Sequence, residues 1–326
     1  MTVCLKKLFS PCRKGRDVLK YPCENDKEGI PLKKIDVHCH VSMWEGTLVA
    51  PDMPYITPDE LKKTFSAFGI EKGMILPLVS PEGQFTVQTN EEAEHIANMH
   101  RDSFYWFCNI DPRMGENNAK TDFSVFLEHY KKRGAIGVGE VTANLYIDDP
   151  LVENLFYHCG ELDMPVTIHM APGFSGGYGL VDDIGLLRLE KMLKKYPKLK
   201  ILGHSTCFWS EISDNVTEEN RDDNGAGKAN GGRIAEMMRE CPNLYCDLSA
   251  GSGYHALNRD KEHAYRFIEE FSDRLLFGSD ITAPNQRAYI SEWLDEEFEK
   301  GNISKENYKK ICRGNAIKLF HLKDEV

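Results

Sequence analysis

The chain has 326 residues, of which 41% are hydrophobic, so it can bury one barrel-sized core or two smaller ones. Its formal net charge of -11 argues against nucleic acid and anionic membranes as general partners, because both attract basic surfaces. No apolar run reaches the roughly 18 residues that a membrane span requires, and residues 1–20 lack the apolar core of a signal peptide. We therefore expect a soluble, cytoplasmic protein.

The ten cysteines are consistent with that compartment. Most of them lie in apolar runs and no pair has Cys-x-x-Cys spacing, which indicates reduced, packed thiols rather than disulfide staples. Cys4, Cys12 and Cys23 near the N-terminus are spaced too widely to favour a metal site.

Short apolar runs rich in Ile, Val, Leu and aromatic residues recur along the chain, as is typical of buried parallel strands. They cover residues 34–37, 73–79, 104–110, 135–140, 165–170, 200–203, 244–248 and 274–278. Longer amphipathic segments lie between them. We predict helices over 58–68, 89–100, 151–162, 186–195 and 261–270.

Strands that alternate with helices predict parallel pairing through right-handed crossovers. Eight such units indicate an α/β fold, namely a (β/α)8 barrel of the TIM type. A doubly wound open sheet is the alternative, but no Gly-x-Gly-x-x-Gly sequence follows the first strand.

Two segments lie outside the repeat. Residues 1–30 form an N-terminal extension, which leaves 31–326 as a single barrel domain. Residues 211–232 follow the sixth strand and are polar and rich in Gly, Asn and Asp. Loops longer than about 15 residues are uncommon unless they are functional or disordered. We expect this insertion to be a lid over the active-site end of the barrel, with a merely mobile insertion as the alternative.

The first predicted strand ends in His38-Cys39-His40. Residues two apart on a strand point the same way, so the two imidazoles aim at one point, as half of a metal site would. Cys39 points the opposite way, and we expect it to pack in the barrel wall. Taken alone, one His-x-His in a chain with 11 histidines is a weak signal.

Four further predicted strands also end in residue types that bind metals. Because the active site of a (β/α)8 barrel lies at the C-terminal ends of its strands, these side chains are predicted to meet at one mouth. The candidate ligands are His38, His40, Glu140, His169, His204 and Asp280. Imidazole and carboxylate ligands without a thiolate suit Zn, Mn, Fe or Co, and we expect Zn.

These sequences resemble the amidohydrolase superfamily and, within it, the amidohydrolase 2 (amidohydrolase-related) family. The matching pieces are Ile35-Asp36-Val37-His38-Cys39-His40, Ile168-His169, Leu202-Gly203-His204, Leu276-Phe277-Gly278-Ser279-Asp280 and the tail from Tyr308 to Ala316. The resemblance extends over about 33–321 and implies a distorted (β/α)8 barrel with one or two divalent ions. It also makes a homo-oligomer an expectation, since such families often dimerise through barrel helices.

The resemblance implies two assignments of roles. In members with one ion, the ligands match His38, His40, His169 and Asp280. His204 then matches the acid or base, and several of these members are decarboxylases. In members with two ions, a group on the fourth strand bridges them, and the histidines of the fifth and sixth strands hold the second ion. Gly139-Glu140-Val141 resembles the Gly-Glu of TatD-like deoxyribonucleases, in which the glutamate is a ligand, and this favours two ions.

The leading hypothesis is a metal-dependent hydrolase in which activated water attacks a carbonyl, ester or amide bond of a small molecule. A divalent ion lowers the pKa of bound water to about 7, and Asp280 would take its proton and pass it to the leaving group. The alternative is a decarboxylase of an aromatic or unsaturated acid with one ion, in which His204 or Asp280 handles the proton. A barrel kept only for binding is disfavoured, because every expected ligand is present.

Substrate contacts are predicted from position alone. Arg113 is the one cation close to a predicted strand end and would bind a carboxylate or phosphate, unless it pairs with a loop acid. Trp44, Tyr178 and Trp209 follow strand ends and would line a pocket, unless they are packing residues. We predict that the acidic residues 295–297 and Glu299 are solvated surface.

Overall fold

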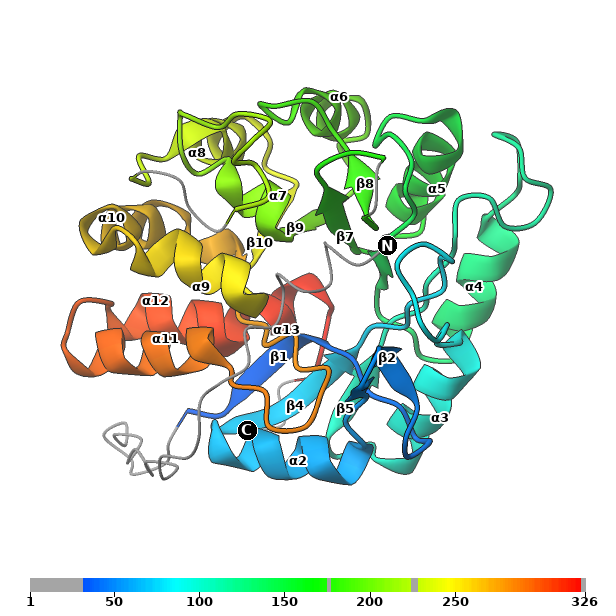
Figure 1. Cartoon of the computed structure of the whole chain (residues 1–326), viewed down its shortest axis with the longest axis horizontal. Helices are drawn as coiled ribbons and strands as arrows, with labels where there is room; N and C mark the ends of the chain where they lie inside the picture. The colour runs from blue at the N-terminus through cyan, green and yellow to red at the C-terminus, as the bar shows by residue number, and fades with distance from the viewer. Residues whose placement is uncertain (1–31, 175–176, 224–227, 324–326) are drawn as a thin grey trace.

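The computed structural model describes residues 32–323 apart from 175–176 and 224–227. The predicted N-terminal extension, with Cys4, Cys12 and Cys23, therefore lies outside the described residues. Strands gather at the centre of the molecule and helices surround them (Figure 1).

Each of the eight apolar runs overlaps a parallel strand. These strands are β1 (Lys34–Cys39), β4 (Ile70–Ile75), β5 (Phe104–Trp106), β6 (Val138–Val141), β7 (Val166–Ala171), β9 (Ile201–His204), β10 (Leu244–Asp247) and β11 (Leu275–Leu276). Every residue of β1, β6 and β9 is buried, so neither face of these strands is exposed to solvent and their sequences show no alternation of polar and apolar residues. This is the reason that they appear as continuous apolar runs in the sequence.

The strands pair in two sheets, in the orders β1-β4-β5 and β6-β7-β9-β10-β11. Backbone contacts join the sheets at both edges. Cys108, beyond β5, bridges Val138 of β6, and Cys39 of β1 bridges Ile281, beyond β11. The N–H of Asp280 also donates to the carbonyl of His38 at 2.8 Å. The order therefore returns to β1, and the architecture is the distorted (β/α)8 barrel that the sequence predicts.

All five predicted helices are present on the outside of the strands (Figure 1). They are α2 (Pro58–Ala67), α3 (Asn90–Met99), α5 (Pro150–Glu161), α6 (Leu187–Lys195) and α10 (Lys261–Phe271). Others complete the outer layer without having been predicted. They are α4 (Ser124–Lys132), α7 (Thr206–Ser210), α8 (Gly232–Glu240), α9 (Ala250–Asn258), α11 (Tyr289–Glu299), α12 (Lys305–Lys309) and α13 (Asn315–Leu319).

Three short strands lie on the loops beyond the barrel strands. β2 (Leu48–Ala50) and β3 (Met53–Pro54) form an antiparallel hairpin after β1, and β8 (Leu180–Val181) pairs with β7. Strands of two or three residues are too short to show a period-2 pattern, and for this reason they were not predicted.

The C-terminal helix closes the end of the barrel opposite the histidines. Phe320, just after α13, packs its ring 5.2 Å from that of Phe107. It belongs to a buried cluster with Ile35 at the start of β1 and with Leu202 of β9. One end of the strands is therefore filled with apolar side chains, which leaves the other end for polar ones.

The part of the insertion before its undescribed residues, 211–223, is held against the rest of the barrel. The Arg221 side chain is almost fully buried and donates to the carbonyl of Asp182 at 2.8 Å. The Arg259 guanidinium of the following helix pair donates to the Ser213 hydroxyl at 2.7 Å. These contacts anchor the insertion, and its role as a lid stays a prediction.

Glu297 was predicted to be solvated surface, and this was wrong. Its side chain in α11 is fully buried and accepts hydrogen bonds from Lys261 at 2.8 Å, from Asn302 at 2.7 Å and from Tyr265. Glu297 lies on the inner face of α11, although it stands in a run of acidic residues. Charge alone does not identify which side of a helix a residue occupies.

Candidate metal centre

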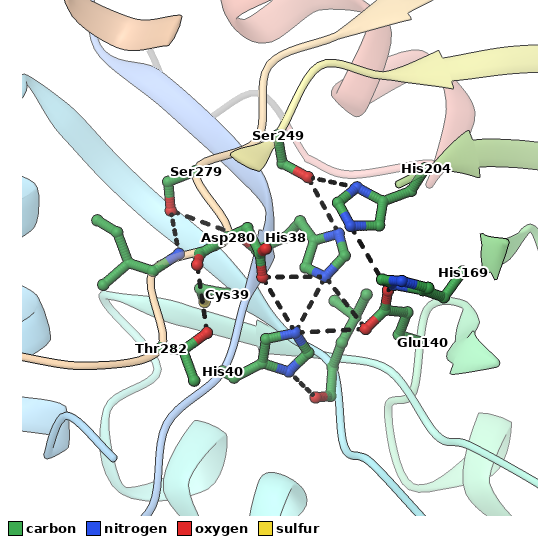
Figure 2. Close-up of polar contacts among 12 residues, drawn as sticks. His38, Cys39, His40, Glu140, His169, His204, Ser249, Ser279, Asp280 and Thr282 are labelled. Atoms are coloured by element: carbon green, nitrogen blue, oxygen red, sulfur yellow. Dashed lines mark hydrogen bonds and ion pairs between the residues drawn. The ribbon is translucent and has the colours of Figure 1, made fainter. Parts of the chain in front are cut away.

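β1 carries His38 and His40 to the mouth of the barrel, where their Nε2 atoms lie 3.0 Å apart (Figure 2). Both rings are held from behind through Nδ1. His38 Nδ1 lies 2.6 Å from a carboxylate oxygen of Asp247, and His40 Nδ1 donates to the carbonyl of Leu76 at 2.7 Å. Each ring therefore presents Nε2 to the same space, as oriented metal ligands do.

Glu140 of β6 and Asp280, just after β11, complete a cage around those two nitrogens. Glu140 Oε2 lies 3.7 Å from His38 Nε2 and 3.6 Å from His40 Nε2. Asp280 Oδ1 lies 3.7 and 3.4 Å from the same two atoms. Four ligands placed tetrahedrally at the length of a zinc bond are about 3.3 Å apart. The five separations among these ligand atoms are close to that value, and His38, His40 and Asp280 form a group that could hold an ion of that size.

The other oxygen of Glu140 faces a second pair of histidines. Glu140 Oε1 lies 2.7 Å from His169 Nδ1 and 3.6 Å from His204 Nε2. His169 and His204 pair with each other across β7 and β9, which places their side chains at one level of the barrel. The ligand atoms of these three residues lie within 4.8 Å of one another. Glu140 thus takes part in two groups, each through a different oxygen.

The structure therefore brings all six predicted ligand residues together at one end of the barrel (Figure 2). Cys39, between the two histidines of β1, is fully buried and donates its thiol to the carbonyl of Met74 at 3.2 Å. It takes no part in the cage.

The histidines of the site lower the pKa values of its two carboxylates by more than burial raises them. Burial raises the pKa of Glu140, but the charges and hydrogen bonds of His169 and His38 hold it well below its usual range. The pKa of Asp280 is lowered in the same way against burial, by His40, His38 and His204. Burial and the charge of His38 lower the pKa of His204 to about 4. At neutral pH both carboxylates are ionised and His204 is neutral, which are the forms that bind a cation.

Asp247 and Ser249 were not predicted as site residues. Asp247 ends β10 and is fully buried, and Ser249 lies two residues beyond it. The Ser249 hydroxyl lies 2.9 Å from His204 Nδ1 and 3.3 Å from His38 Nδ1. The sequence held only a partial signal, because Asp247 lies near the end of the seventh apolar run, but its position there does not show that it faces His38.

Asp36 and Ser279 hold the segment that carries Asp280. The Asp36 carboxylate accepts the backbone N–H groups of Ser279 at 2.8 Å and of His38 at 3.0 Å, and also the Ser279 hydroxyl. Burial raises the pKa of Asp36 to about 7, although these hydrogen bonds act to lower it. Asp280 itself has φ 55°, in the left-handed region, and this turn carries its carboxylate to the cage.

The four predicted substrate residues differ in where they lie. The Arg113 guanidinium is paired with Glu82, at 2.8 Å through one of its two contacts, and with Asp111 at 2.6 Å. The Tyr178 ring lies 4.4 Å from that of His169, and Trp44 is 64% exposed.

Trp209 is buried in the wall, where its indole N–H donates to the carbonyl of Asp247 at 2.9 Å. Of the four residues, Tyr178 is the one for which the structure describes a contact with the ring of a predicted ligand, His169. Their roles toward a substrate stay predictions.

The fold and the cage define a class, a (β/α)8 barrel with metal-ligand side chains at the C-terminal ends of its strands. The profile of the amidohydrolase family matches residues 35–322, and the chain belongs to this family. Members of the family are metal-dependent enzymes that include hydrolases and decarboxylases. Curated proteins show no significant sequence match to the chain. None of the described helices is long and apolar enough to span a membrane.

Solved structures share the fold at low sequence identity. One is an uncharacterised TIM-barrel protein from Bordetella bronchiseptica, with 21% identity, a TM-score of 0.62, and coverage of 89% of this chain and 99% of that one. Another is an amidohydrolase from Burkholderia multivorans with bound zinc, with 13% identity, a TM-score of 0.60, and coverage of 90% and 100%. A third is a dihydroxybenzoic acid decarboxylase from Polaromonas with bound manganese and 2-nitroresorcinol, with 18% identity, a TM-score of 0.56, and coverage of 89% and 97%.

Proposed function

We propose that this protein is a hydrolase that holds two divalent ions and cleaves a carbonyl, ester or amide type bond of a small molecule. The observation that carries the proposal is the placement of Glu140. One of its oxygens lies beside His38 and His40, and the other lies beside His169 and His204. A carboxylate placed in this way suits two ions held side by side. Zn is the ion that we expect, and Mn, Fe and Co suit the same donors.

Divalent ions bound in these groups would polarise the scissile bond and supply activated water at neutral pH. Asp280 would move the proton. Its carboxylate stays ionised, because the surrounding histidines hold its pKa below the usual range in spite of burial. Its side chain is 25% exposed, against 4% for Glu140, so it is the carboxylate of the cage that a substrate meets first. It accepts the proton of the attacking water and returns it to the leaving group.

One observation favours a second candidate, the decarboxylation of an aromatic or unsaturated acid with a single ion. The cage of His38, His40, Glu140 and Asp280 already offers four ligands without the other two histidines. His204 would then remain a neutral imidazole held by the Ser249 hydroxyl at 2.9 Å, which suits a base that exchanges a proton with the substrate. The decarboxylase from Polaromonas has the same fold and a bound metal.

The number of bound ions and the reaction catalysed distinguish the two candidates, and the Glu140→Gln variant tests the role of Glu140 in the two-ion site. We expect about two ions per chain in the protein reconstituted with Zn, because the site offers two ligand groups. In Glu140→Gln, which keeps the size of the side chain but loses its charge, we expect about one ion or fewer. Hydrolysis of a panel of p-nitrophenyl esters, lactones and amides should fall to background in this variant. Elemental analysis and initial rates measure both effects.

Glu94→Gln is the matched control, since Glu94 is also buried but pairs with Arg133. It should leave metal content and rate unchanged. One ion per chain together with an active Glu140→Gln would contradict the two-ion hydrolase. Release of carbon dioxide from a panel of hydroxybenzoic and unsaturated acids would support the decarboxylase instead.

A further inference from the structure

Asp247 and Ser249 lie behind the candidate metal centre, at the end of β10 and at the start of α9. Both are fully buried. They contact Nδ1 of His38 and of His204, whose ring centroids lie 4.5 Å apart. Figure 2 shows Ser249 beside these two rings, on the side away from the cage. His38 lies in one group with His40 and Asp280, and His204 lies in another with Glu140 and His169. The two histidines also form a third group with Asp247, which therefore joins the other two groups from behind.

The same two side chains contact both rings. Asp247 Oδ2 lies 2.6 Å from His38 Nδ1 and 3.6 Å from His204 Nδ1. The Ser249 hydroxyl reverses that preference, at 2.9 Å from His204 Nδ1 and 3.3 Å from His38 Nδ1. Asp247 therefore mainly holds the first histidine, and Ser249 mainly holds the second.

The Asp247 carboxylate has no freedom to turn away. Its Oδ1 accepts the backbone N–H of Ser249 at 2.9 Å, which fixes Oδ2 toward His38. The indole N–H of Trp209 holds the backbone carbonyl of Asp247 at 2.9 Å. A carboxylate fixed in this way keeps the ring proton of His38 on Nδ1, and the lone pair of Nε2 then faces the cage.

We infer that Asp247 and Ser249 are positioning residues shared by the two ligand groups, and that they couple the binding of one divalent ion to the binding of the other. An ion bound by His38 keeps the ring proton of His38 on Nδ1, where it donates to Asp247. The Ser249 hydroxyl, which contacts both Nδ1 atoms, is then left to accept the ring proton of His204 and to hold His204 ready for a second ion. This inference rests on the proposed two-ion function. The inference adds that Asp247 and Ser249, which are not among the six proposed ligands, connect the two groups by hydrogen bonds, so that the groups bind their ions as one unit.

The Asp247→Asn substitution tests the inference sharply, because it keeps size and burial but removes one acceptor. Asp247 uses one oxygen for the Ser249 N–H and the other for His38 Nδ1. An asparagine has a single side-chain oxygen, so its NH2 group must face one of these two donors in either orientation. His38 is then driven to the wrong tautomer, or Ser249 loses its anchor.

The experiment titrates the metal-free protein with Zn alone, by calorimetry and by competition with a chelating dye. Loss of a hydrogen-bond partner behind a metal-binding histidine costs 10–100-fold in metal affinity. We expect Asp247→Asn to weaken both ions by about that factor. We expect Ser249→Ala to weaken mainly the second ion and to remove the coupling between the two binding steps. The visible absorption of bound Co(II) should change in both variants, since it reports ligand geometry directly.

Asp182→Asn and Ser210→Ala are matched controls. Asp182 is a buried aspartate whose oxygens accept three backbone N–H groups at the start of α6, and the buried Ser210 hydroxyl donates to the carbonyl of Cys207 at 3.0 Å. Both should leave Zn affinity unchanged while they test the cost of altering a buried polar group. Circular dichroism of each metal-free variant establishes that it is folded.

Zn affinities in Asp247→Asn and Ser249→Ala equal to those of the parent protein would overturn the inference. If the parent protein binds a single ion, the two-ion function fails. A weaker single ion in Asp247→Asn would still support the positioning of His38, whereas an unchanged one would refute it. The failure of the function and the failure of this inference are therefore distinguishable.

Discussion

Tyr55 is a single residue whose hydroxyl has no hydrogen-bond partner within the described part of the chain. It follows β3, and its neighbour Ile56 links the loop after His40 to the loop after Asp280, through backbone bonds of 3.2 Å to Ser42 and 2.8 Å to Thr282. The side chain is only 2% exposed. Burial raises its pKa, and the charges of Glu92, Glu140 and Asp280 add to this effect. The phenol therefore stays protonated, and no described residue pairs with it.

We predict that Tyr55→Phe stabilises the metal-free protein by about 1 kcal/mol, because a buried hydroxyl without a partner costs roughly 1–3 kcal/mol. Urea unfolding measures the difference. Tyr130→Phe is the control, since the Tyr130 hydroxyl donates to Glu91 at 3.1 Å. The free energy of unfolding of Tyr130→Phe should instead fall by about 0.5–1.5 kcal/mol. A loss of stability in Tyr55→Phe as large as that in Tyr130→Phe would mean that the Tyr55 hydroxyl is satisfied in solution.

The six candidate ligands were accessible to sequence reasoning because each one lies at the end of a predicted strand. Strand direction alone then places His38, Glu140, His204 and Asp280 at one mouth. The groups behind them were not accessible in the same way. Whether Asp247 faces His38 depends on how β10 packs against β1, which are 209 positions apart in the chain at these two residues. A strand-end aspartate is otherwise indistinguishable from a helix cap.

At the scale of elements, a buried ionic network joins α10 and α11. Burial alone would raise the pKa of Glu297, but Lys261, Tyr265 and Asn302 outweigh burial and lower the pKa to about 2. The folded pKa lies below the usual value of 4.5, so the network contributes stability above about pH 4.5. That contribution is lost as the pH falls toward 2.

We predict that Glu297→Gln destabilises the protein by about 2–3 kcal/mol at pH 7, given 1.36 kcal/mol for each pKa unit and the partial exposure of Lys261. The difference from the parent protein should shrink as the pH falls below about 4.5, because the Glu297 carboxylate of the unfolded chain then takes up a proton while that of the folded protein stays ionised. Denaturant unfolding at a series of pH values between 3 and 7 measures the difference in unfolding free energy between the variant and the parent protein.

Glu296→Gln supplies the comparison, because the neighbouring Glu296 side chain is 57% exposed and pairs only with Lys300 among the described residues. An exposed pair of this kind is worth about 0.5 kcal/mol or less. Equal and pH-independent losses in the two variants would refute a special role for Glu297.

The elements that the sequence predicted well are the ones with a clear repeat. Fully buried parallel strands appear as apolar runs, and α6, with apolar residues on one face and lysines on the other, has an unambiguous period. α7 is five residues long and α9 begins with Ala250-Gly251-Ser252-Gly253, a sequence with little helical preference. Tertiary packing at the mouth, rather than local preference, makes these segments helical.

At the scale of the whole molecule, the barrel gathers negative charge where its strands end. Glu140 and Asp247 are buried there and Asp280 is partly buried, and histidines hold the pKa of each carboxylate low. Without a cation, the three carboxylates depend on imidazolium partners, above all on His38. Burial would lower the pKa of His38, but Asp247 and Glu140 raise it well above its usual value. A divalent ion takes the place of that proton and compensates the carboxylates with a larger charge.

The last prediction follows from this balance, since an ion that binds only the folded state stabilises the entire barrel. At a free Zn concentration about 100-fold above Kd, the gain is about 2.7 kcal/mol. For a domain of this size, that gain corresponds to a rise in Tm of about 5 °C. Thermal unfolding with added Zn, Mn or Co should show the rise, and a chelator should reverse it. Ca²⁺, which prefers six to eight oxygen ligands, should have little effect. The rise in Tm should be smaller in Glu140→Gln. A Tm that does not change with Zn, Mn or Co would contradict a metal site in this barrel.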